Sequence, residues 1–472
     1  MHRSFVALVA VILSLGSVQA FAQGEYPELY ARHARPQPYV DAFVLPAPDG
    51  GEAHFVVRIP NSLLVFKRER EPLAGSPFVA RVELTVQVRS GENLVAERSW
   101  RVAHTAESYE VSTSRSHDLV GRIPIALPPG DYSYRVLLGE ESGDVFPLAT
   151  RVLRVPAFAN GAVGTPMPVV ARSAAAFTPS ALGGNLPYGG EGSFLVPVTL
   201  SEGESAEALE YVIWRLPETV KGEARRAPAR VEDARRLQWE GVRAEDLDLE
   251  KAVRVTEGAV SRSDWIAYAP TSARDASTDV SVRIAGGSTS TAFLVPIEVD
   301  DVSDAGTRYA LEVRLRDAAP ASRTVVPFSF HWRDMPIALH DAETAIRLLS
   351  FIESEGRIRE LLQGSAADRE AAFLEYWSER DPTPETPFNE LMAEYYRRID
   401  HAALTYRTGG GPVPDGLRTD QARVYIVHGP PGHVDRAFPP SGGVEETWTY
   451  DDGRRFVFWA ASSLEPLALQ RD

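Results

Sequence analysis

The sequence of residues 380–406, RDPTPETPFNELMAEYYRRIDHAALTY, joins a proline-rich polar loop to an amphipathic pattern. Thr386 is a suitable N-cap and Pro387 a suitable first helical residue. The pattern therefore predicts a long helix, and a helix start explains much of the loop without any chemistry. The apolar side chains that recur at the 3.6-residue spacing of one helix face are Phe388, Leu391, Met392, Tyr395, Ile399, Ala402, Ala403 and Tyr406.

The segments on either side of this helix also have patterns of regular secondary structure. Asp341 is placed to cap one shorter helix, and Ser365 with Asp368 forms a capping-box pattern ahead of another. After the long helix, Val424 and Ile426 alternate with other residues at a period of two, which predicts a strand.

The last part of the chain has the pattern of a small sheet. Residues 446–450 and 454–459 flank the turn Asp451-Asp452-Gly453, which predicts a β-hairpin. Residues 335–472 are therefore expected to form an α+β domain, with its helices first and its strands last.

The residues ahead of this domain show the period of two that is typical of strands. Within 24–156, apolar side chains from Ala80 to Val88 alternate with polar ones, and turn signals separate such runs. Residues 194–334 are also β-rich, and 157–193, rich in Ala, Gly and Pro, are expected to be a linker or long loop. We predict a mixed multidomain protein, in which two antiparallel, immunoglobulin-like β-sandwich modules precede the α+β domain.

The first residues have the features of a cleaved secretory signal. Met1-His2-Arg3 is a basic start, Phe5–Leu15 is an apolar core, and Val18–Ala22 contains small residues at cleavage-site spacing. This apolar run is shorter than the roughly 20 residues that a membrane-spanning helix needs. Residues 1–22 are therefore expected to be removed, leaving a periplasmic or secreted protein without a transmembrane segment.

Composition excludes several kinds of site and disfavours others. The chain has no cysteine, which excludes a lipidated-cysteine anchor, disulfides, thiolate nucleophiles and cysteine-bound zinc. The formal net charge is −16, which disfavours binding to nucleic acid because phosphate backbones are bound through clustered Lys and Arg. We expect no nucleic-acid partner, no lipid anchor and no cofactor.

A series of polar, aromatic and glycine residues runs in a fixed order through the C-terminal region. We refer to these residues as the signature: Trp377, Arg380, Asp381, Thr386, Asn389, Glu390, Arg398, Gly416, Thr419, Asp420, Arg423, Tyr425, Gly429 and Trp448. The signature resembles the GWxTD-domain family of bacterial exported proteins. The eponymous motif is Gly-Leu-Arg-Thr-Asp at 416–420, with Leu417 where the family has tryptophan. The family has no established activity, so the resemblance implies a location more than a mechanism.

The polar side chains of the signature have two interpretations. Because arginine forks suit carboxylates, the signature is interpreted first as an ion-pair network that joins the long helix to the small sheet. The alternative is a functional site, which either binds a ligand or belongs to a hydrolase that uses Asp381, Glu390 or Asp420 with His428. The hydrolase requires two of these groups within about 3–8 Å of each other in an open cleft.

Other catalytic and metal-binding patterns are missing from the sequence. The chain contains no G-x-S-x-G elbow, Walker loop or H-E-x-x-H motif. His428 and His433 are too few to hold a metal without a carboxylate partner, so no metal site is expected.

These observations favour a non-enzymatic protein of the cell envelope. We expect the β modules to present the C-terminal domain to an envelope protein partner. Carbohydrate binding by the β modules is a further alternative, and it predicts a surface row of aromatic side chains.

Overall fold

The structure of the chain is a computed structural model. It describes residues 25–33, 36–47, 50–73, 75–141, 143–158, 162–173, 176–189, 192–199, 208–217, 247, 249–261, 266–269, 275–284, 291–297, 307–316, 323–386, 388–407, 415–440, 442–462 and 465–470. These residues form two units. The β unit is Pro36–Asp334, and the C-terminal unit combines Met335–Asp472 with the N-terminal segment up to Arg35. The segment predicted to be a signal, residues 1–22, lies outside the described residues.

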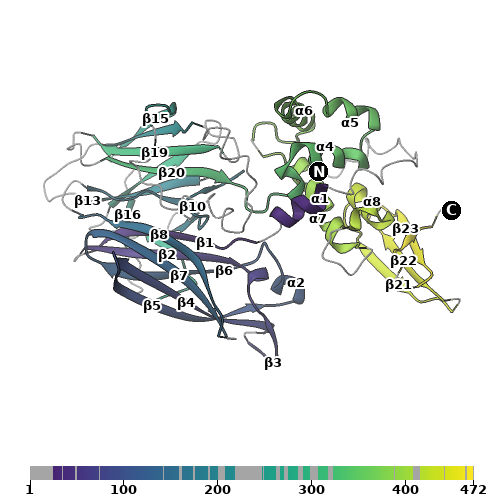
Figure 1. Ribbon diagram of the computed structural model, residues 1–472, viewed down its shortest axis with the longest axis horizontal. Coiled ribbons are helices and arrows are strands. Elements are labelled where there is room, and N and C mark those ends of the chain that lie inside the picture. The colour runs from purple at the N-terminus through teal and green to yellow at the C-terminus, as the bar shows by residue number, and fades with distance from the viewer. Residues whose placement is uncertain are drawn as a thin grey trace. The chain divides into compact units, whose positions relative to one another are not determined.

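The first half of the β unit is built from antiparallel strands in two sheets that share one core (Figure 1). The three-stranded sheet consists of β1 (Tyr39–Ala47), β2 (Gly50–Pro60) and β6 (Asp118–Leu127). The other sheet consists of β3 (Lys67–Leu73), β4 (Ser76–Ser90), β5 (Asn93–Ala106), β7 (Gly130–Glu140) and β8 (Val145–Val155). The short helices η2 (Asn61–Leu63) and α2 (Tyr109–Ser112) lie between strands. The predicted alternation is present in β4, where Val82, Leu84 and Val86 are buried in this core.

The second half of the β unit also has two sheets around one core. The seven-stranded sheet consists of β9 (Ala162–Val163), β10 (Met167–Ser173), β11 (Ala176–Pro179), β13 (Gly192–Thr199), β16 (Ile266–Ala269), β17 (Val282–Ile284) and β18 (Thr291–Ile297). The five-stranded sheet consists of β12 (Leu186–Pro187), β14 (Ala208–Arg215), β15 (Val253–Ser261), β19 (Arg308–Leu315) and β20 (Arg323–His331). β12 pairs with β20 in parallel.

The segment 157–193 differs from the linker or long loop that its composition predicts. Strands β9 to β12 all lie within it. Met167, Val169 and Phe177 are buried in a core cluster that also contains residues of β1 and β2. Glycine and proline end these strands so early that a period of two is not visible in the sequence. The segment is therefore part of the second module and joins it to the first.

The sheet β1–β2–β6 is buried on both faces. Phe55 and Val57 face the first core, whereas Val56 packs in the cluster shared with β10 and β11. His54 and Arg122 lie on the same face as Val56, and both are almost fully buried. The His54 ring stacks on Phe43 with the ring centroids 5.1 Å apart. Burial, with a smaller effect of the Arg122 charge, lowers the pKa of His54 to about 3.

We expect this buried histidine to make the β unit sensitive to acid. The pKa of His54 falls from an ordinary value of 6.5 to about 3 on folding, so the unfolded chain binds more protons between these pH values. The stabilisation is fully present above pH 6.5 and is lost as the pH falls towards 3, at up to about 1.4 kcal/mol per pH unit. Urea unfolding of the β unit at pH 7 and pH 5 measures this loss.

The variant His54→Phe keeps an aromatic ring against Phe43 and removes the titrating group, so its stability should depend less on pH. His117→Gln, at an exposed histidine, is the matched control and should keep the wild-type dependence. NMR titration of the histidine ring protons gives an independent check. A His54 signal that titrates near pH 6.5 in the folded protein would contradict the assignment.

The C-terminal unit is a set of short helices followed by a four-stranded antiparallel sheet (Figure 1). The helices are α1 (Glu25–His33), η8 (Ile337–His340), α4 (Ala342–Leu348), η9 (Leu349–Phe351), α5 (Glu355–Leu361), α6 (Ala366–Ser378), α7 (Glu390–Thr405), η10 (Gly416–Arg418) and α8 (Asp420–His428). The strands are β21 (His433–Ala437), β22 (Val444–Thr449), β23 (Arg455–Ala460) and β24 (Ala468–Leu469). None of the helices in the described part of the chain combines the length and apolar character that spanning a bilayer requires.

Helix α7 is the centre of the helical core. Its buried tyrosines keep their hydroxyl groups satisfied by reaching carbonyl groups at the end of α4. The Tyr395 hydroxyl donates to the Leu348 carbonyl at 2.6 Å, and the Tyr396 hydroxyl donates to the Ala345 carbonyl at 2.7 Å. The predicted long helix, the Asp341 cap and the β22–β23 hairpin are all present.

The strand predicted around Val424 and Ile426 is wrong, because these residues belong to helix α8. Both side chains are buried, but they lie in different cores. Val424 packs with the small sheet, and Ile426 packs with the helices. A helix that is buried on two sides places apolar residues at i and i+2, which imitates the alternation of a strand.

The N-terminal helix α1 is a second difference. Residues from 24 onwards were predicted to begin the first β module, but α1 is part of the C-terminal unit. Tyr26 and Leu29 of α1 are buried in the helical core.

Candidate functional site

The loop between α6 and α7 is organised by the side chain of Asn389. Its Oδ1 accepts the Met392 N–H at 2.8 Å and so caps α7, and its Nδ2 donates to the Trp377 carbonyl at 2.8 Å near the end of α6. The cap predicted at Thr386 is therefore wrong, since the Thr386 hydroxyl donates to the Thr383 carbonyl at 3.1 Å. Pro387 lies outside the described residues. One buried amide thus connects two helix ends.

Two acidic residues of the signature, Asp381 in this loop and Glu390 at the start of α7, contact the same threonine. The Thr383 N–H donates to Asp381 Oδ1 at 2.9 Å, and the Thr383 hydroxyl donates to Glu390 Oε2 at 2.5 Å. The first contact forms a turn of the kind that Asp favours. The second holds a carboxylate at the first residue of α7, where the helix dipole stabilises negative charge.

Arg380 stabilises the other side of the loop, at the C-terminal end of α6. Its guanidinium donates to the Tyr376 carbonyl at 2.7 Å and lies 3.8 Å from the centre of the Tyr376 ring. It is also 3.6 Å from Glu353, which accepts the Tyr376 hydroxyl at 2.9 Å. Burial and the Glu353 carboxylate raise the pKa of Tyr376. A cation is favourable at this end of a helix.

The first two residues of the 416–420 motif pack against the helical core. A Cβ on Gly416 would lie only 2.3 Å from the Ala402 carbonyl oxygen of α7, so η10 approaches α7 closely through this glycine. Leu417, where the family has tryptophan, is 7% exposed and belongs to the helical core. The motif thus keeps an apolar side chain at its second position.

The last two residues of the motif satisfy backbone groups. The Thr419 hydroxyl accepts the Ala422 N–H at 3.1 Å, which caps α8, and it donates to the Gly416 carbonyl at 2.9 Å. Asp420 Oδ2 accepts the Leu469 N–H of β24 at 2.9 Å. The motif therefore ties η10, α8 and the small sheet together.

The junction of the helices with the sheet differs from the predicted ion-pair network. Arg398 pairs with Glu394 at 2.8 Å, one turn earlier on the same helix. Across the junction, Glu446 Oε1 of β22 accepts from Gln421 at 2.8 Å. The same oxygen accepts from the Trp448 indole at 2.8 Å. The described contacts between helix and sheet are thus mainly hydrogen bonds from neutral donors and ring packing.

The remaining signature residues lie around this junction. The Tyr425 ring packs 6.5 Å from the Trp448 ring, centroid to centroid. The Gly429 carbonyl accepts the Tyr450 hydroxyl at 3.0 Å. Gly429 has φ +82°, and a Cβ there would meet the Arg398 guanidinium at 3.1 Å. Arg423 is exposed on α8.

The two histidines near the end of α8 have different surroundings. His428 Nδ1 lies 2.6 Å from an Arg454 guanidinium nitrogen, so this ring nitrogen is the acceptor. Burial first, and the Arg454 charge second, lower the pKa of His428 to about 4. His433 is exposed and lies 3.1 Å from Asp435. In the described part of the chain, no three His, Asp or Glu side chains gather as metal ligands do.

The structure thus brings Asp381 and Glu390 together but places His428 against Arg454. Sequence reasoning missed Glu446 and Gln421, which join α8 to the sheet. In the sequence, the one indication is the position of Glu446, which lies two residues before Trp448 and so on the same face of β22.

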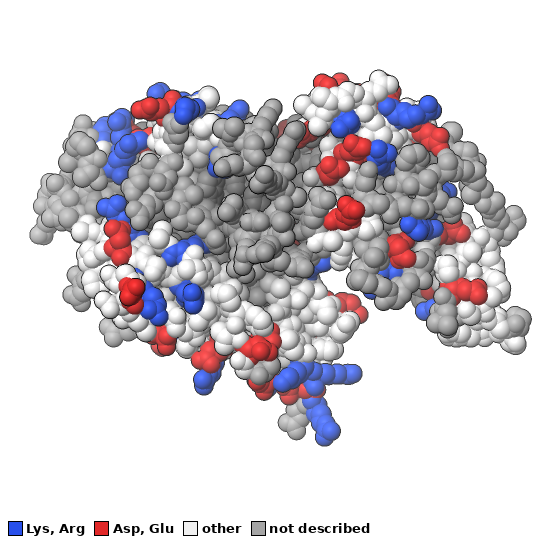
Figure 2. All heavy atoms as spheres, in the orientation of Figure 1, with Lys and Arg blue, Asp and Glu red and all other residues white. Residues whose placement is uncertain are grey.

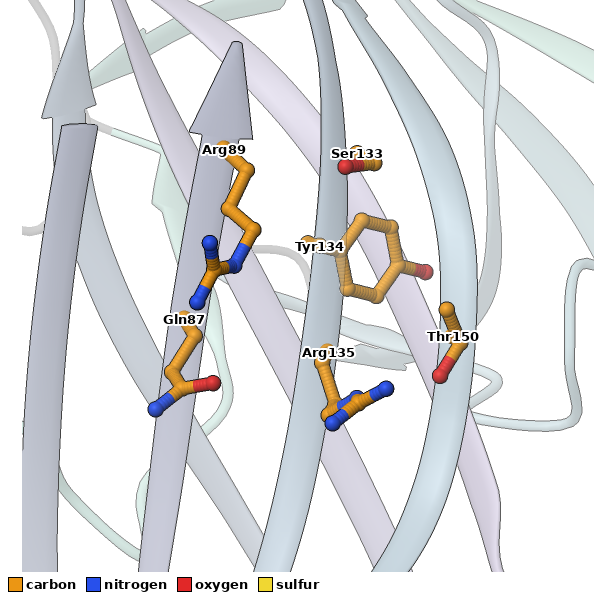
Figure 3. Close-up of a pocket in the computed structure, with 6 residues that line it drawn as sticks. All are labelled: Gln87, Arg89, Ser133, Tyr134, Arg135 and Thr150. Carbon is orange, nitrogen blue, oxygen red and sulfur yellow. The ribbon is translucent and has the colours of Figure 1, made fainter. Parts of the chain in front are cut away.

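The β unit has a polar depression of about 270 Å³ on the surface of the β4–β7–β8 sheet. Figure 3 shows its lining residues, which are Gln87, Arg89, Ser133, Tyr134, Arg135 and Thr150. The guanidinium groups of Arg89 and Arg135 come from neighbouring strands. Tyr134 is buried and packs on Phe55, so it does not offer the exposed aromatic surface that sugar stacking predicts. Within the depression, the Arg89 guanidinium donates to the Glu92 carbonyl at 2.8 Å, and the Gln87 amide donates to the Glu97 carboxylate at 2.7 Å.

We expect Asn389→Ala to lower the free energy of unfolding of the C-terminal unit by about 2–4 kcal/mol. The change removes a helix cap and leaves the buried Trp377 carbonyl without this donor. Thr386→Ala, in the same loop, is the matched control and should change the stability by less than about 0.5 kcal/mol. Equal effects of the two changes in urea unfolding would contradict the capping role of Asn389.

Gly416→Ala should destabilise the same unit by about 1–3 kcal/mol, because the added methyl group would overlap α7. Gly356→Ala is the control, since a Cβ there meets only the Ser354 hydroxyl, at 3.9 Å. That change in the first turn of α5 should be neutral or stabilise by up to about 1 kcal/mol. A Gly416→Ala protein as stable as wild type would disprove the close approach of η10 to α7.

One comparison with known proteins agrees with the sequence resemblance. A sequence model of the GWxTD domain matches residues 320–462, so the C-terminal region of this chain is a GWxTD domain. No curated protein matches the chain. Among solved structures, the chain is similar to the crystal structure of chicken CNTN1 FN1-FN3 domains, at 12% sequence identity and a TM-score of 0.16. That similarity covers 62% of this chain and 67% of the other.

Proposed function

We propose that this protein is an exported, non-enzymatic protein of the cell envelope, in which the β unit carries a GWxTD domain that binds another protein. The observation that supports this proposal is how the signature side chains are engaged. Asn389, Thr419 and Asp420 contact backbone groups at helix ends and strands, in the way that structural residues do. Under this proposal residues 1–22 are a signal, the protein is periplasmic or secreted, and the two β modules are immunoglobulin-like.

The surface that supports binding is the edge of the small sheet. All five residues of β21 are exposed, and among the described residues this strand pairs with β22 alone. Val434 on β21 is 46% exposed, and Phe438 directly after it is 70% exposed. An edge strand with exposed apolar side chains is a template for an extended segment of a partner, which adds a strand through main-chain hydrogen bonds.

On the face of the molecule that Figure 2 shows, basic and acidic side chains of the described residues are interspersed. Such a surface suits the specific docking of one partner better than the non-specific adsorption of a polyanion.

We expect the double change Val434→Lys and Phe438→Ser to abolish crosslinking of the protein to its partner in native envelopes. The charged and polar side chains remove the apolar anchor and leave the buried core of the sheet intact. Phe146→Ser is the matched control, because Phe146 of β8 is also exposed, at 49%. A partner that is recovered equally with wild type and the double variant would overturn the proposed surface. A protein that crosslinks to nothing would overturn the proposed function.

The polar depression of the β unit supports a second candidate, which is binding of an acidic polysaccharide. Two guanidinium groups provide the charge, and the hydroxyl groups of Ser133 and Thr150 provide neutral hydrogen bonds. Arg135→Ala should weaken binding of polygalacturonate at least about tenfold, whereas neutral dextran should not bind. Arg101→Ala on β5, at an 82% exposed side chain, is the control. Equal binding by the two variants would exclude the depression.

A further inference from the structure

Helix α1 packs into the GWxTD domain although it lies at the other end of the chain. Tyr26 is 1% exposed and Leu29 is 7% exposed, and both belong to the helical core. The matched region of the domain, 320–462, does not contain these residues. The core of this domain is therefore completed by a segment that lies outside the matched region.

One carboxylate of α7 organises the contact. Asp400 Oδ1 accepts the Tyr26 hydroxyl at 2.6 Å, and Asp400 Oδ2 accepts the Ile337 N–H at 2.9 Å. Asp400 thus satisfies the first turn of η8 with one oxygen and binds α1 with the other. Hydrogen bonds to a charged acceptor are stronger than those between neutral groups.

A second contact fixes the far end of α1. The ring of His33, the last residue of the helix, stacks on His340 with the centroids 4.0 Å apart and the planes 9° apart. Tyr26 and His33 lie at opposite ends of α1. Their partners are on α7 and on η8. The helix is therefore held at both ends and along one buried side.

We propose that η8 and α7 form a docking groove whose occupant is α1 of the same chain. The complete folded unit then consists of residues 25–33 together with 335–470. A helix of nine residues is too short to be stable alone in water, so α1 acquires its helical form by docking. This inference stands on the contacts of α1 and does not rest on the proposed function.

The test uses the full-length chain with a specific protease site between His33 and Tyr39. After cleavage, the segment that contains α1 is expected to stay with the rest of the protein in size-exclusion chromatography. The double change Tyr26→Phe and Leu29→Asp should release it. Release of the wild-type segment would overturn the proposal, and so would retention of the altered segment.

A second measurement does not depend on cleavage. Hydrogen exchange at the Ile337 amide should become at least about tenfold faster in Tyr26→Phe, because Asp400 loses a ligand that orients it. Tyr109→Phe is the matched control, at a tyrosine of the β unit that is 65% exposed. An unchanged exchange rate in Tyr26→Phe would show that α1 does not support η8, which contradicts the proposal.

A synthetic peptide of residues 24–34 identifies the occupant. Added in excess after cleavage, it should displace the segment and become helical on binding, as observed by circular dichroism. A peptide with Tyr26→Phe and Leu29→Asp is its control. If the wild-type peptide neither displaces the segment nor becomes helical, the groove does not recognise α1.

Discussion

The unsatisfied backbone groups at the ends of short helices are the constraint on which the GWxTD domain depends. Each helix end leaves up to four N–H or C=O groups without partners in the helix. Five of its helices have 7–16 residues, so a large share of their backbone lies near an end. The signature residues meet this demand: Asn389 caps α7 and reaches the end of α6, and Thr419 caps α8. These polar side chains are thus engaged with backbone groups of the helices.

Local rules predicted part of this domain, and tertiary packing decided the rest. Asp341 and Ser365 are caps, as their sequence context indicates, because capping acts within one helical turn. Thr386 is also a residue type that is favoured at an N-cap. Asn389 is the cap instead, because its amide also reaches the Trp377 carbonyl of another helix. No local pattern reports such a contact. The strand predicted through Val424 fails for the same reason, since α8 lies between two cores.

The β unit shows a similar division. The alternation in β4 predicted a strand with one buried and one solvent-facing side. In the structure, the residues on the second side are exposed or partly exposed. The strand β2 is instead buried on both faces, because the second module covers the side that carries His54 and Val56. His54 and Arg122 are polar groups buried in that apolar contact. Burying them is costly, and for the histidine the cost grows at low pH. The short strands of 157–193 depend on this junction, so their composition alone resembles a linker.

The boundaries of the domain follow from the same reasoning. A family model ends where its sequence pattern fades, whereas a folded unit ends where its polar groups are satisfied. Two carboxylates inside the matched region 320–462 find partners outside it: Asp400 binds Tyr26, and Asp420 binds the Leu469 N–H. Cutting the chain at the limits of the match would strip a partly buried carboxylate on α7 and an exposed carboxylate on α8 of these donors. The folded unit is therefore larger than the matched region at both ends.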